Sequence, residues 1–434
     1  MDAGSVDPNA VKPAKGKAYT FTTHMPGRHA VPRLVWLLVV CVTRVASAQV
    51  LPSEPITLAG GRVTVSGDVS AGYGSDDSGF FNFTDYEHSA LRLLRLNLTA
   101  AVKAGPHFTL LGEIRSENLG PVRPYALYLR VRPWTTRDFD IQLGRVPPTF
   151  GAFARRTYAN DNPLIGYPLA YQYLTTLRSD AVPASADELL RKRSLGWLVR
   201  YSLGEPAAEE GVPLVSAFRW DTGVQAHATV GMLSATAAVT AGSLSLPLVS
   251  DDRHGRQTAG RIELRPAVGL ILGASVARGP FMGEAAARAA VGDGHETEFT
   301  QTAWGGDAEY SRDHYLLRFE TIFSRWQVPI ATPPARQLAL QTPLGAVSAS
   351  VEGRYKLRPD LYVAARYDHL GFSDQTGATA TLPWDAPVTR LEIGAGYSLQ
   401  RNLLLKGSFQ GDDRDGGVLQ KIARLVAAQV VFWF

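Results

Sequence analysis

Cysteine is nearly absent from this sequence of 434 residues, which holds a single one, Cys41. A disulfide needs two thiols and structural zinc sites use several, so both classes of stabilising site are excluded. Long apolar runs are also scarce. The run at residues 34–42 is about half of the roughly 20 residues that a transmembrane helix needs. A mean hydropathy of −0.06 is likewise too low for a bundle of membrane helices.

Sequence signatures of common enzymes are also missing. The chain has no Gly-x-Ser-x-Gly turn, His-Glu-x-x-His pair, phosphate-binding loop or dinucleotide fingerprint. A net charge of +4 is small for this length, so it gives no reason to expect a nucleic-acid partner. We predict no enzymatic activity, no cofactor and no metal site. Two clusters were weighed as surface metal sites, and we interpret both as solvated loops: His254 with Asp251 and Asp252, and His295 with Glu296 and Glu298.

The N-terminal region resembles a secretory signal peptide. Basic residues precede the apolar run, and Ala46-Ser47-Ala48 follows it as a small-residue cleavage site before Gln49. The basic residues are Arg28, His29 and Arg33. We expect residues 1–48 to be removed, and we interpret the polar stretch before Met25 as an over-extended start. Because Cys41 lies in this segment, the mature chain contains no cysteine, and residues 49–61 form a short periplasmic segment.

Beyond residue 61 the dominant pattern is period-two alternation of apolar and polar residues, which predicts β-strands. In residues 347–356, for example, the odd positions are mostly apolar or small and the even positions are mostly polar. Gly, Pro, Asp and Asn separate segments of about ten residues. We count sixteen segments, at residues 62–73, 90–103, 107–117, 122–132, 138–146, 222–231, 233–242, 258–265, 269–278, 302–311, 315–326, 344–357, 361–370, 388–399, 402–410 and 424–434.

Alternation also occurs in soluble β-sandwiches. The lengths of the connections distinguish such a sandwich from a membrane β-barrel. Tight connections such as residues 265–267 and 311–314 alternate with long ones such as 278–300 and 327–343. Short periplasmic turns and longer outer loops are typical of a transmembrane antiparallel β-barrel. The fold class is therefore all-β. Sixteen strands are expected, or eighteen if residues 194–203 and 212–220 also cross the membrane.

The last segment ends on Phe434, and apolar residues occupy the alternate positions Val426, Ala428, Val430 and Phe432. This ending resembles that of bacterial outer-membrane β-barrels, whose terminal strand is read by the barrel-assembly machinery. The resemblance implies the bacterial outer membrane as location, the assembly machinery as a partner and Phe434 as the assembly signal.

Residues 147–220 lie between two predicted strands and form the longest connection of the chain. They follow Leu143-Gly144-Arg145 and open with Val146-Pro147-Pro148-Thr149-Phe150-Gly151-Ala152-Phe153. This segment resembles the one before the pore loop of porins of the phosphate-selective O and P type, although those have a simpler Pro-Phe-Gly. The resemblance implies a long extracellular loop that folds inward and narrows the pore. Phosphate selectivity is not inferred.

Charged residues on the alternating segments are assigned to the lumen, because an arginine or lysine facing lipid costs about 2–4 kcal/mol at the bilayer midplane. The predicted pore constriction consists of Arg130, Arg132, Arg145, Arg155 and Arg156. The predicted pore wall includes Arg318, Glu320, Arg354, Arg366 and Arg390. Opposite charges two residues apart, as in Arg366 and Asp368, suggest cross-strand salt bridges that stiffen a water-filled wall.

These observations predict a porin, a passive diffusion channel for small hydrophilic solutes with a mild anion preference. The expected partners are small anionic or neutral solutes, outer-membrane lipid and lipopolysaccharide, and, by resemblance to porins, two further copies in a homo-trimer. Three alternatives stay open. The barrel could be a non-conducting binding or adhesion protein or an outer-membrane hydrolase, and the basic long loop could lie outside the pore and contact lipopolysaccharide phosphates.

Overall fold

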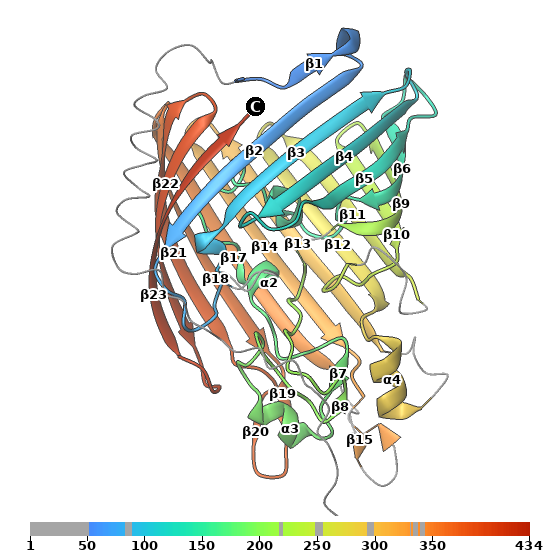
Figure 1. Cartoon of the computed structure of the whole chain (residues 1–434), viewed down its shortest axis with the longest axis vertical. Coiled ribbons are helices and arrows are strands. Elements are labelled where there is room, and N and C mark those ends of the chain that lie inside the picture. Colours follow the sequence, from blue (N-terminus) through green and yellow to red (C-terminus); the bar gives the residue numbers. More distant parts are fainter. Residues whose placement is uncertain are drawn as a thin grey trace, which may run out of the picture. The chain divides into compact units, whose positions relative to one another are not determined.

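The computed structural model of this chain describes residues 52–82, 89–216, 220–247, 255–292, 299–329, 331–332, 337–338 and 343–434. The expected signal peptide lies outside the described residues, as do the two histidine clusters. In the described part, sixteen long antiparallel strands surround a lumen (Figure 1). They are β2 (Val63–Gly74), β3 (Leu94–Lys103), β4 (Phe108–Glu117), β5 (Arg123–Val131), β6 (Phe139–Val146), β9 (Asp221–Val230), β10 (Leu233–Thr240), β11 (Gln257–Ala267), β12 (Leu270–Pro280), β13 (Thr300–Arg312), β14 (Tyr315–Trp326), β17 (Leu344–Arg358), β18 (Leu361–Phe372), β21 (Val388–Gln400), β22 (Leu403–Arg414) and β23 (Ile422–Trp433).

The remaining elements are short and lie in the connections. They are β1 (Ile56–Leu58), η1 (Ala59–Gly61), η2 (Ala90–Arg92), η3 (Phe153–Arg156), α2 (Leu169–Gln172), β7 (Ala181–Val182), α3 (Ala186–Arg191), β8 (Leu203–Gly204), α4 (Glu284–Val291), β15 (Ala331–Thr332), β16 (Gln337–Leu338), β19 (Asp374–Thr376) and β20 (Thr381–Pro383). Among the helices of the described residues, none is long and apolar enough to cross a membrane.

Pairing between the first and last long strands closes the barrel. Strand β23 pairs with β2 from Trp433 opposite Asp68 to Ala427 opposite Gly74. Strand β6 pairs directly with β9, with Val146 opposite Asp221, so residues 147–220 leave and re-enter the wall at neighbouring points. The stretches at 194–203 and 212–220 add no wall strand. The number of strands is therefore sixteen and not eighteen.

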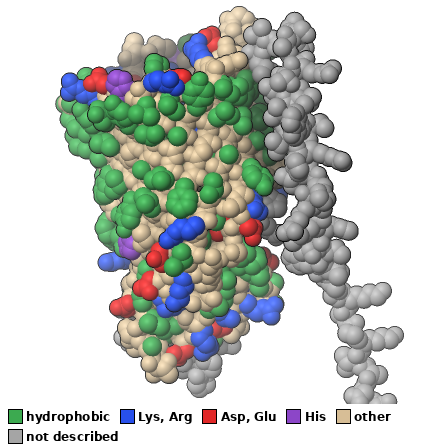
Figure 2. Space-filling view, turned by 90° about the vertical axis from the view of Figure 1, so that its left-hand side faces the viewer, with side chains coloured by type: hydrophobic (Ala, Val, Ile, Leu, Met, Phe, Trp, Pro, Cys, Tyr) green, Lys and Arg blue, Asp and Glu red, His purple; other side chains and the backbone are tan. Residues whose placement is uncertain are grey.

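Burial on the strands is the reverse of that in a soluble protein. On β10, Ser234, Thr236 and Thr240 are buried, whereas Leu233 and Val239 are 46% and 48% exposed. A wall that buries polar side chains and exposes apolar ones suits a surrounding of lipid, and closure leaves no unpaired edge in it. Figure 2 shows hydrophobic side chains in bands on one side of the barrel, with charged groups at its upper rim and in its lower part.

The two ends of the barrel differ in the length of their connections. Tight turns join β9 to β10 at Gly231 and β11 to β12 at Gly269, and both glycines have a positive φ. The opposite end carries the long connections, with α3, α4, β19 and β20 (Figure 1). We call these the periplasmic and extracellular ends, following the asymmetry of outer-membrane barrels.

The C-terminal residue completes the closing seam. The backbone N–H of Phe434 donates to the Gly67 carbonyl at 2.9 Å, and the N–H of Gly67 donates to the Phe434 carbonyl at 3.1 Å. The Phe434 ring also lies so close to Gly67 that an added Cβ there would be 3.0 Å from its Cε1 atom. Phe434 thus pairs the end of the chain with its first long strand.

Deletion of Phe434 is expected to reduce the yield of folded barrel strongly, because it removes both backbone hydrogen bonds and the aromatic terminus. Heat-modifiable migration of membrane fractions on denaturing gels measures the folded fraction. Deletion of the residues before Met25 serves as the control and should leave that fraction unchanged. A Phe434 deletion that folds as well as the parent would contradict a role of this residue in assembly.

Candidate functional site: the lumen and its inward-folded loop

Residues 147–220, called the long loop below, turn into the lumen directly after β6. Gly151 permits the turn, because its φ is +76° and an added Cβ would stand 2.3 Å from the Tyr171 hydroxyl oxygen. The N–H of Gly151 donates to Ser275 Oγ on β12 at 3.1 Å. The N–H of Ala152 donates to Glu320 Oε1 on β14 at 2.7 Å, and the Tyr171 hydroxyl donates to the same oxygen. The loop therefore crosses the lumen from β6 towards β12 and β14.

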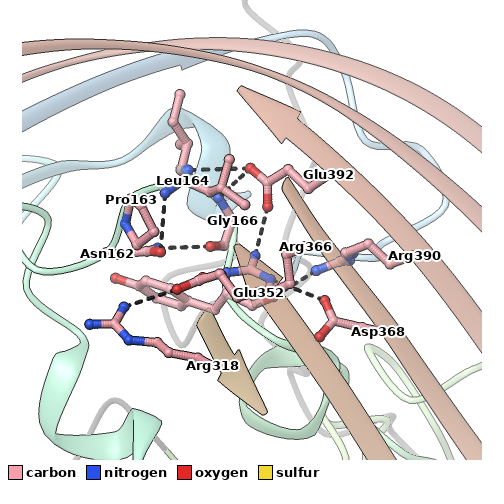
Figure 3. A network of polar contacts seen from close by, with 12 residues as sticks. Asn162, Pro163, Leu164, Gly166, Arg318, Glu352, Arg366, Asp368, Arg390 and Glu392 are labelled. Atoms are coloured by element: carbon pink, nitrogen blue, oxygen red, sulfur yellow. Dashed lines mark hydrogen bonds and ion pairs between the residues drawn. The ribbon is translucent and has the colours of Figure 1, made fainter. Parts of the chain in front are cut away.

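The inner part of the long loop is also bound to the wall by Glu392 and Lys406. Glu392 on β21 accepts the N–H groups of Ile165 and Gly166 at 3.2 and 2.9 Å (Figure 3). The buried ammonium group of Lys406 on β22 donates to three carbonyl oxygens of the loop, at 2.7, 2.9 and 3.1 Å. Those carbonyls belong to Ala159, Asn162 and Leu164. These are charge-assisted bonds, which are the stronger class of hydrogen bond.

Two further arginines bind the inner part of the loop from other strands. Arg95 on β3 donates to the Tyr167 hydroxyl at 2.7 Å and to the Thr157 carbonyl at 3.2 Å, and pairs with Glu117 at 2.6 Å. Arg390 on β21 donates to the Tyr167 carbonyl at 3.0 Å. The loop thus contacts the inner wall at β3, β12, β14, β21 and β22. It is therefore attached to strands on different sides of the lumen.

The outer part of the loop lies in a hydrophobic core near the extracellular end, which it shares with residues of α4 such as Ala286 and Ala287. Leu177, Val182, Leu189, Val199 and Tyr201 are buried together. Around this core, Arg178 pairs with Asp180 and donates to the carbonyls of Val199 and Ala207. This part is therefore held both by packing against α4 and by hydrogen bonds within the loop.

Asp385, in the connection between β20 and β21, fastens this outer part. Its carboxylate accepts the N–H groups of Thr176 at 2.8 Å, Ser194 at 2.7 Å and Ala386 at 2.7 Å. Burial raises the pKa of this carboxyl, and the backbone donors oppose that shift. The ring of Phe80 also stacks on that of Trp197 in the loop, with centroids 3.9 Å apart, which is a second contact that holds this outer part.

Opposite charges alternate along one row of the inner wall. Glu309, Arg318, Glu352, Arg366 and Glu392 stand directly opposite one another on β13, β14, β17, β18 and β21, and we call them the charge row. Each neighbouring pair is in contact, at 2.9, 2.9, 3.2 and 2.7 Å in that order. Figure 3 shows the last three of these contacts. Arg318 and Arg366 are therefore bound across strands, as expected for wall arginines, whereas Arg354 forms no ion pair with a described residue. Of the candidate pairs two residues apart, Arg366 with Asp368 is in contact at 3.1 Å.

The charge row extends into the long loop through Arg156, which pairs with Glu309 at 2.8 Å. With Arg156 and Asp368 included, the network holds three guanidinium groups and four carboxylates. Such a network is not positively charged as a whole. Arg156 is therefore a weaker source of anion preference than an unpaired arginine at the same place.

Some inward-facing cations in the periplasmic half of the barrel form no ion pair with a described carboxylate. Arg130 stands opposite Thr109 and Gln142, and Arg354 opposite Leu316 and Ala364. Both are half-buried, and neither has an ion pair with any described residue. Lys103 and Lys356 are exposed near the ends of β3 and β17. The carboxylates Asp68 and Asp140, by contrast, are buried and accept hydrogen bonds from Asn97 and Gln142.

The other predicted constriction residues lie elsewhere. Arg145 stands opposite Leu127, a lipid-facing residue that is 54% exposed, and binds the carbonyls of Trp220 and Pro124. Its register thus places it on the outward row of β6 with Leu143, and not on the lumen wall beside the constriction as predicted. Gly144, with a φ of +124°, directly precedes it. Arg132 follows β5 at the periplasmic rim, and its N–H donates to His107. Arg155 lies in η3, and its side chain is outside the described part.

Several residues of the site carried no sequence signal for their role. Lys406 was assigned inward by alternation, but nothing in the sequence indicated that it binds loop carbonyls. Asp385 is a polar residue in an outer connection and Ser275 a polar residue in the middle of β12, both of them common patterns. Gly151 was part of the Pro-Pro-Thr-Phe-Gly segment, and a required positive φ is the physical reason for a glycine there. In the described residues no group of acidic, His or Cys side chains could hold a metal.

Comparisons with known proteins concern the fold. No family model and no curated protein matches the sequence. The barrel is similar to the outer-membrane expressed OmpT of Vibrio cholerae, at 12% identity, with 88% of this chain and 100% of that chain covered and a TM-score of 0.51. It is similar to an anion-selective porin from Comamonas acidovorans, at 11% identity, covering 86% and 99%, with a TM-score of 0.52.

A third similar structure is OmpF of Salmonella typhi in complex with daunomycin, at 10% identity, covering 86% and 97%, with a TM-score of 0.51. This chain therefore has the fold of outer-membrane porins. The similarity of the barrels confirms the predicted fold class and agrees with the predicted location in the bacterial outer membrane. The resemblance to the phosphate-selective O and P type rests on the sequence segment alone.

Gly151→Ala is expected to loosen the long loop, because the new methyl group would clash with the Tyr171 hydroxyl and the Glu320 carboxylate. Gly105→Ala is the matched control. Gly105 also has a positive φ, +96°, but an added Cβ there meets nothing within 4 Å. Both variants carry the backbone cost of a left-handed alanine, about 1–2 kcal/mol. Limited proteolysis of folded protein should cleave the loop faster only in Gly151→Ala. Equal cleavage of both variants would show that the close contact at Gly151 does not hold the loop.

Proposed function

We propose that this protein is a porin, a passive channel for small hydrophilic solutes, and not an enzyme. The observation that carries the proposal is the long loop, which is held across a polar, sixteen-stranded barrel by wall residues from several strands. A loop bound in this way narrows a water-filled passage and leaves the wall intact. An adhesion protein would need its loops exposed on the cell surface. Residues 150–173 of this loop lie inside the lumen instead.

A mild anion preference is part of the proposal, and its source is Arg130 and Arg354 more than Arg156. The predicted contribution of Arg155 stays part of the proposal. Fixed charges in a narrow passage act at an effective dielectric constant well below that of water, where a pair at 4 Å interacts by about 4 kcal/mol. The Arg156 charge is offset by Glu309, whereas neither Arg130 nor Arg354 forms an ion pair with a carboxylate among the described residues. Rings of basic side chains favour anions in other pores. Lys103 and Lys356 would attract anions at the periplasmic mouth.

The remaining partners predicted from the sequence belong to the same proposal. Small anionic or neutral solutes would pass through the lumen, and the barrel-assembly machinery would read the strand that ends at Phe434. Outer-membrane lipid and lipopolysaccharide would surround the apolar wall. The chain would assemble as a homo-trimer, and the phosphate-selective O and P type stays the nearest sequence resemblance.

Purified protein in a planar bilayer should form stable open channels whose reversal potential in a salt gradient has the sign of anion preference. Replacing both Arg130 and Arg354 by Ser should shift the reversal potential towards cations, because it removes two unpaired lumen charges. A several-fold fall in the anion-to-cation permeability ratio is expected.

The control for that experiment is a double variant, Arg278→Ser with Arg325→Ser, which removes the same charge from the outward face. It should leave the reversal potential unchanged. Absence of conductance from folded protein would contradict the channel itself. Equal shifts in both double variants would contradict only the assignment of selectivity to Arg130 and Arg354.

The expected trimer can be measured separately. Light scattering of the folded protein in mild detergent, corrected for bound detergent, should give three times the mass of the chain. Boiling should convert this species to monomer. A monomeric mass before boiling would remove the trimer from the proposal and leave the barrel and the channel unaffected.

A further inference from the structure

Two arginines lie on the outward face of the barrel, where the neighbouring strand positions are mostly apolar. Arg278 on β12 and Arg325 on β14 are both exposed. The register places them in one row, with Thr302 of β13 directly opposite each of them. Thr258 of β11 stands opposite Arg278 at the other side. Since neighbouring strands lie about 4.8 Å apart, the two arginines are about 10 Å apart at the backbone, on either side of a threonine.

These arginines are at the extracellular ends of their strands. Arg278 is two residues before Pro280, the last residue of β12, and Arg325 is one residue before Trp326, the last of β14. An outward arginine costs about 2–4 kcal/mol at the membrane midplane but only about 0–1 kcal/mol near the interface. Their position is therefore compatible with the outer headgroup region and not with the membrane core.

An aromatic pair marks the depth of the interface below them. Trp304 and Phe323 stand opposite each other, two residues closer to the midplane than Thr302 and Arg325. Their rings are stacked, with centroids 5.8 Å apart. The Arg325 guanidinium lies 5.3 Å from the Trp304 ring centroid. Tryptophan and other aromatic residues gather at the boundary between acyl chains and headgroups, so the arginines stand at headgroup level.

Neither arginine is neutralised by a carboxylate among the described residues. Other outward arginines near the extracellular ends are occupied: Arg92 pairs with Asp76, and Arg424 donates to the carbonyls of Asp412 and Ala423. This surface thus combines two guanidinium groups that have no ion pair among the described residues with two threonine hydroxyls and an apolar aromatic floor. Guanidinium groups bind phosphate oxygens in a forked geometry that ammonium groups do not offer.

The geometry points to a binding site for a phosphate-bearing lipid of the outer leaflet, formed by Arg278, Arg325, Thr258, Thr302 and Trp304. The arginines and the hydroxyls take the phosphate of the headgroup, and Trp304 with Phe323 packs against the first part of its acyl chains. This site depends on the membrane placement of the barrel and not on conduction. Its failure would leave the channel proposal standing.

The test is native mass spectrometry of the folded, full-length protein in neutral detergent, titrated with diphosphorylated lipid A. The double variant Arg278→Gln with Arg325→Gln should retain this lipid at least about tenfold more weakly, equivalent to roughly 1.4 kcal/mol. The control is Arg312→Gln with Arg358→Gln, which makes the same change of charge at the periplasmic rim and should bind as the parent. Heat-modifiable migration and conductance confirm that both double variants are folded.

Two further arms identify the recognised group. Dephosphorylated lipid A with the same acyl chains should bind the parent as weakly as diphosphorylated lipid A binds the arginine variant. Inorganic phosphate should not displace the bound lipid, because it lacks the acyl chains that pack on the aromatic floor. Undiminished binding by the arginine variant, equal binding of the dephosphorylated lipid, or displacement by inorganic phosphate would each overturn the assignment.

Discussion

Charged side chains buried on the inner wall of the barrel need partners, and the long loop supplies many of them. Arg95, Arg390, Glu392 and Lys406 are all at most 4% exposed. Each of them forms hydrogen bonds to backbone groups or a tyrosine of the loop. A buried donor or acceptor without a partner costs about 1–3 kcal/mol, and more when it is charged. Withdrawal of the loop from the lumen therefore requires water to replace all of these contacts together.

The same constraint explains why the wall charges alternate in sign. Removing a charge from water costs more than one opposite charge usually repays, unless the geometry and additional hydrogen bonds are good. In the charge row, Arg366 contacts Glu352, Glu392 and Asp368 at once, and Glu392 also accepts two loop N–H groups. The row therefore stiffens the wall and positions the loop. In the proposed channel, ion selectivity would then depend on cations outside the row, such as Arg130 and Arg354.

Strand positions were predictable because a closed membrane barrel turns alternate residues to lipid and to a polar lumen. Each strand therefore appears in the sequence as an alternation of apolar and polar residues. Most strand ends agree with the predicted segments within about two residues. Strand β22 is an exception: it continues to Arg414, four residues beyond the predicted end. Residues 411–414 resemble a loop because Gly, Asp and Arg follow one another, yet Asp412 points inward to bind Arg390 at 2.7 Å. Alternation cannot be recognised where both faces carry polar residues.

The arrangement of the loop could be predicted only in outline. Its length and its opening segment indicated an inward fold, but its contacts are made largely by backbone groups, whose partners leave no pattern in the sequence. Arg156 illustrates the limit: its charge was apparent, and its pairing with Glu309 was not. Arg145 illustrates another: it was predicted on the lumen wall beside the constriction, but it shares the outward face of β6 with Leu143.

The central claim is that the inner part of the long loop obstructs the lumen, and excision of the loop tests it most directly. Val146 and Asp221 stand opposite each other, so a short Gly-Ser turn can replace residues 147–220 without stretching the wall. The Thr175 N–H binds the Val212 carbonyl at 3.1 Å, so residues 176–211 can be removed alone as the control. Single-channel conductance should rise markedly on full excision and stay near the parent value in the control. A full excision that conducts like the parent, or a control that conducts like the full excision, would contradict the account.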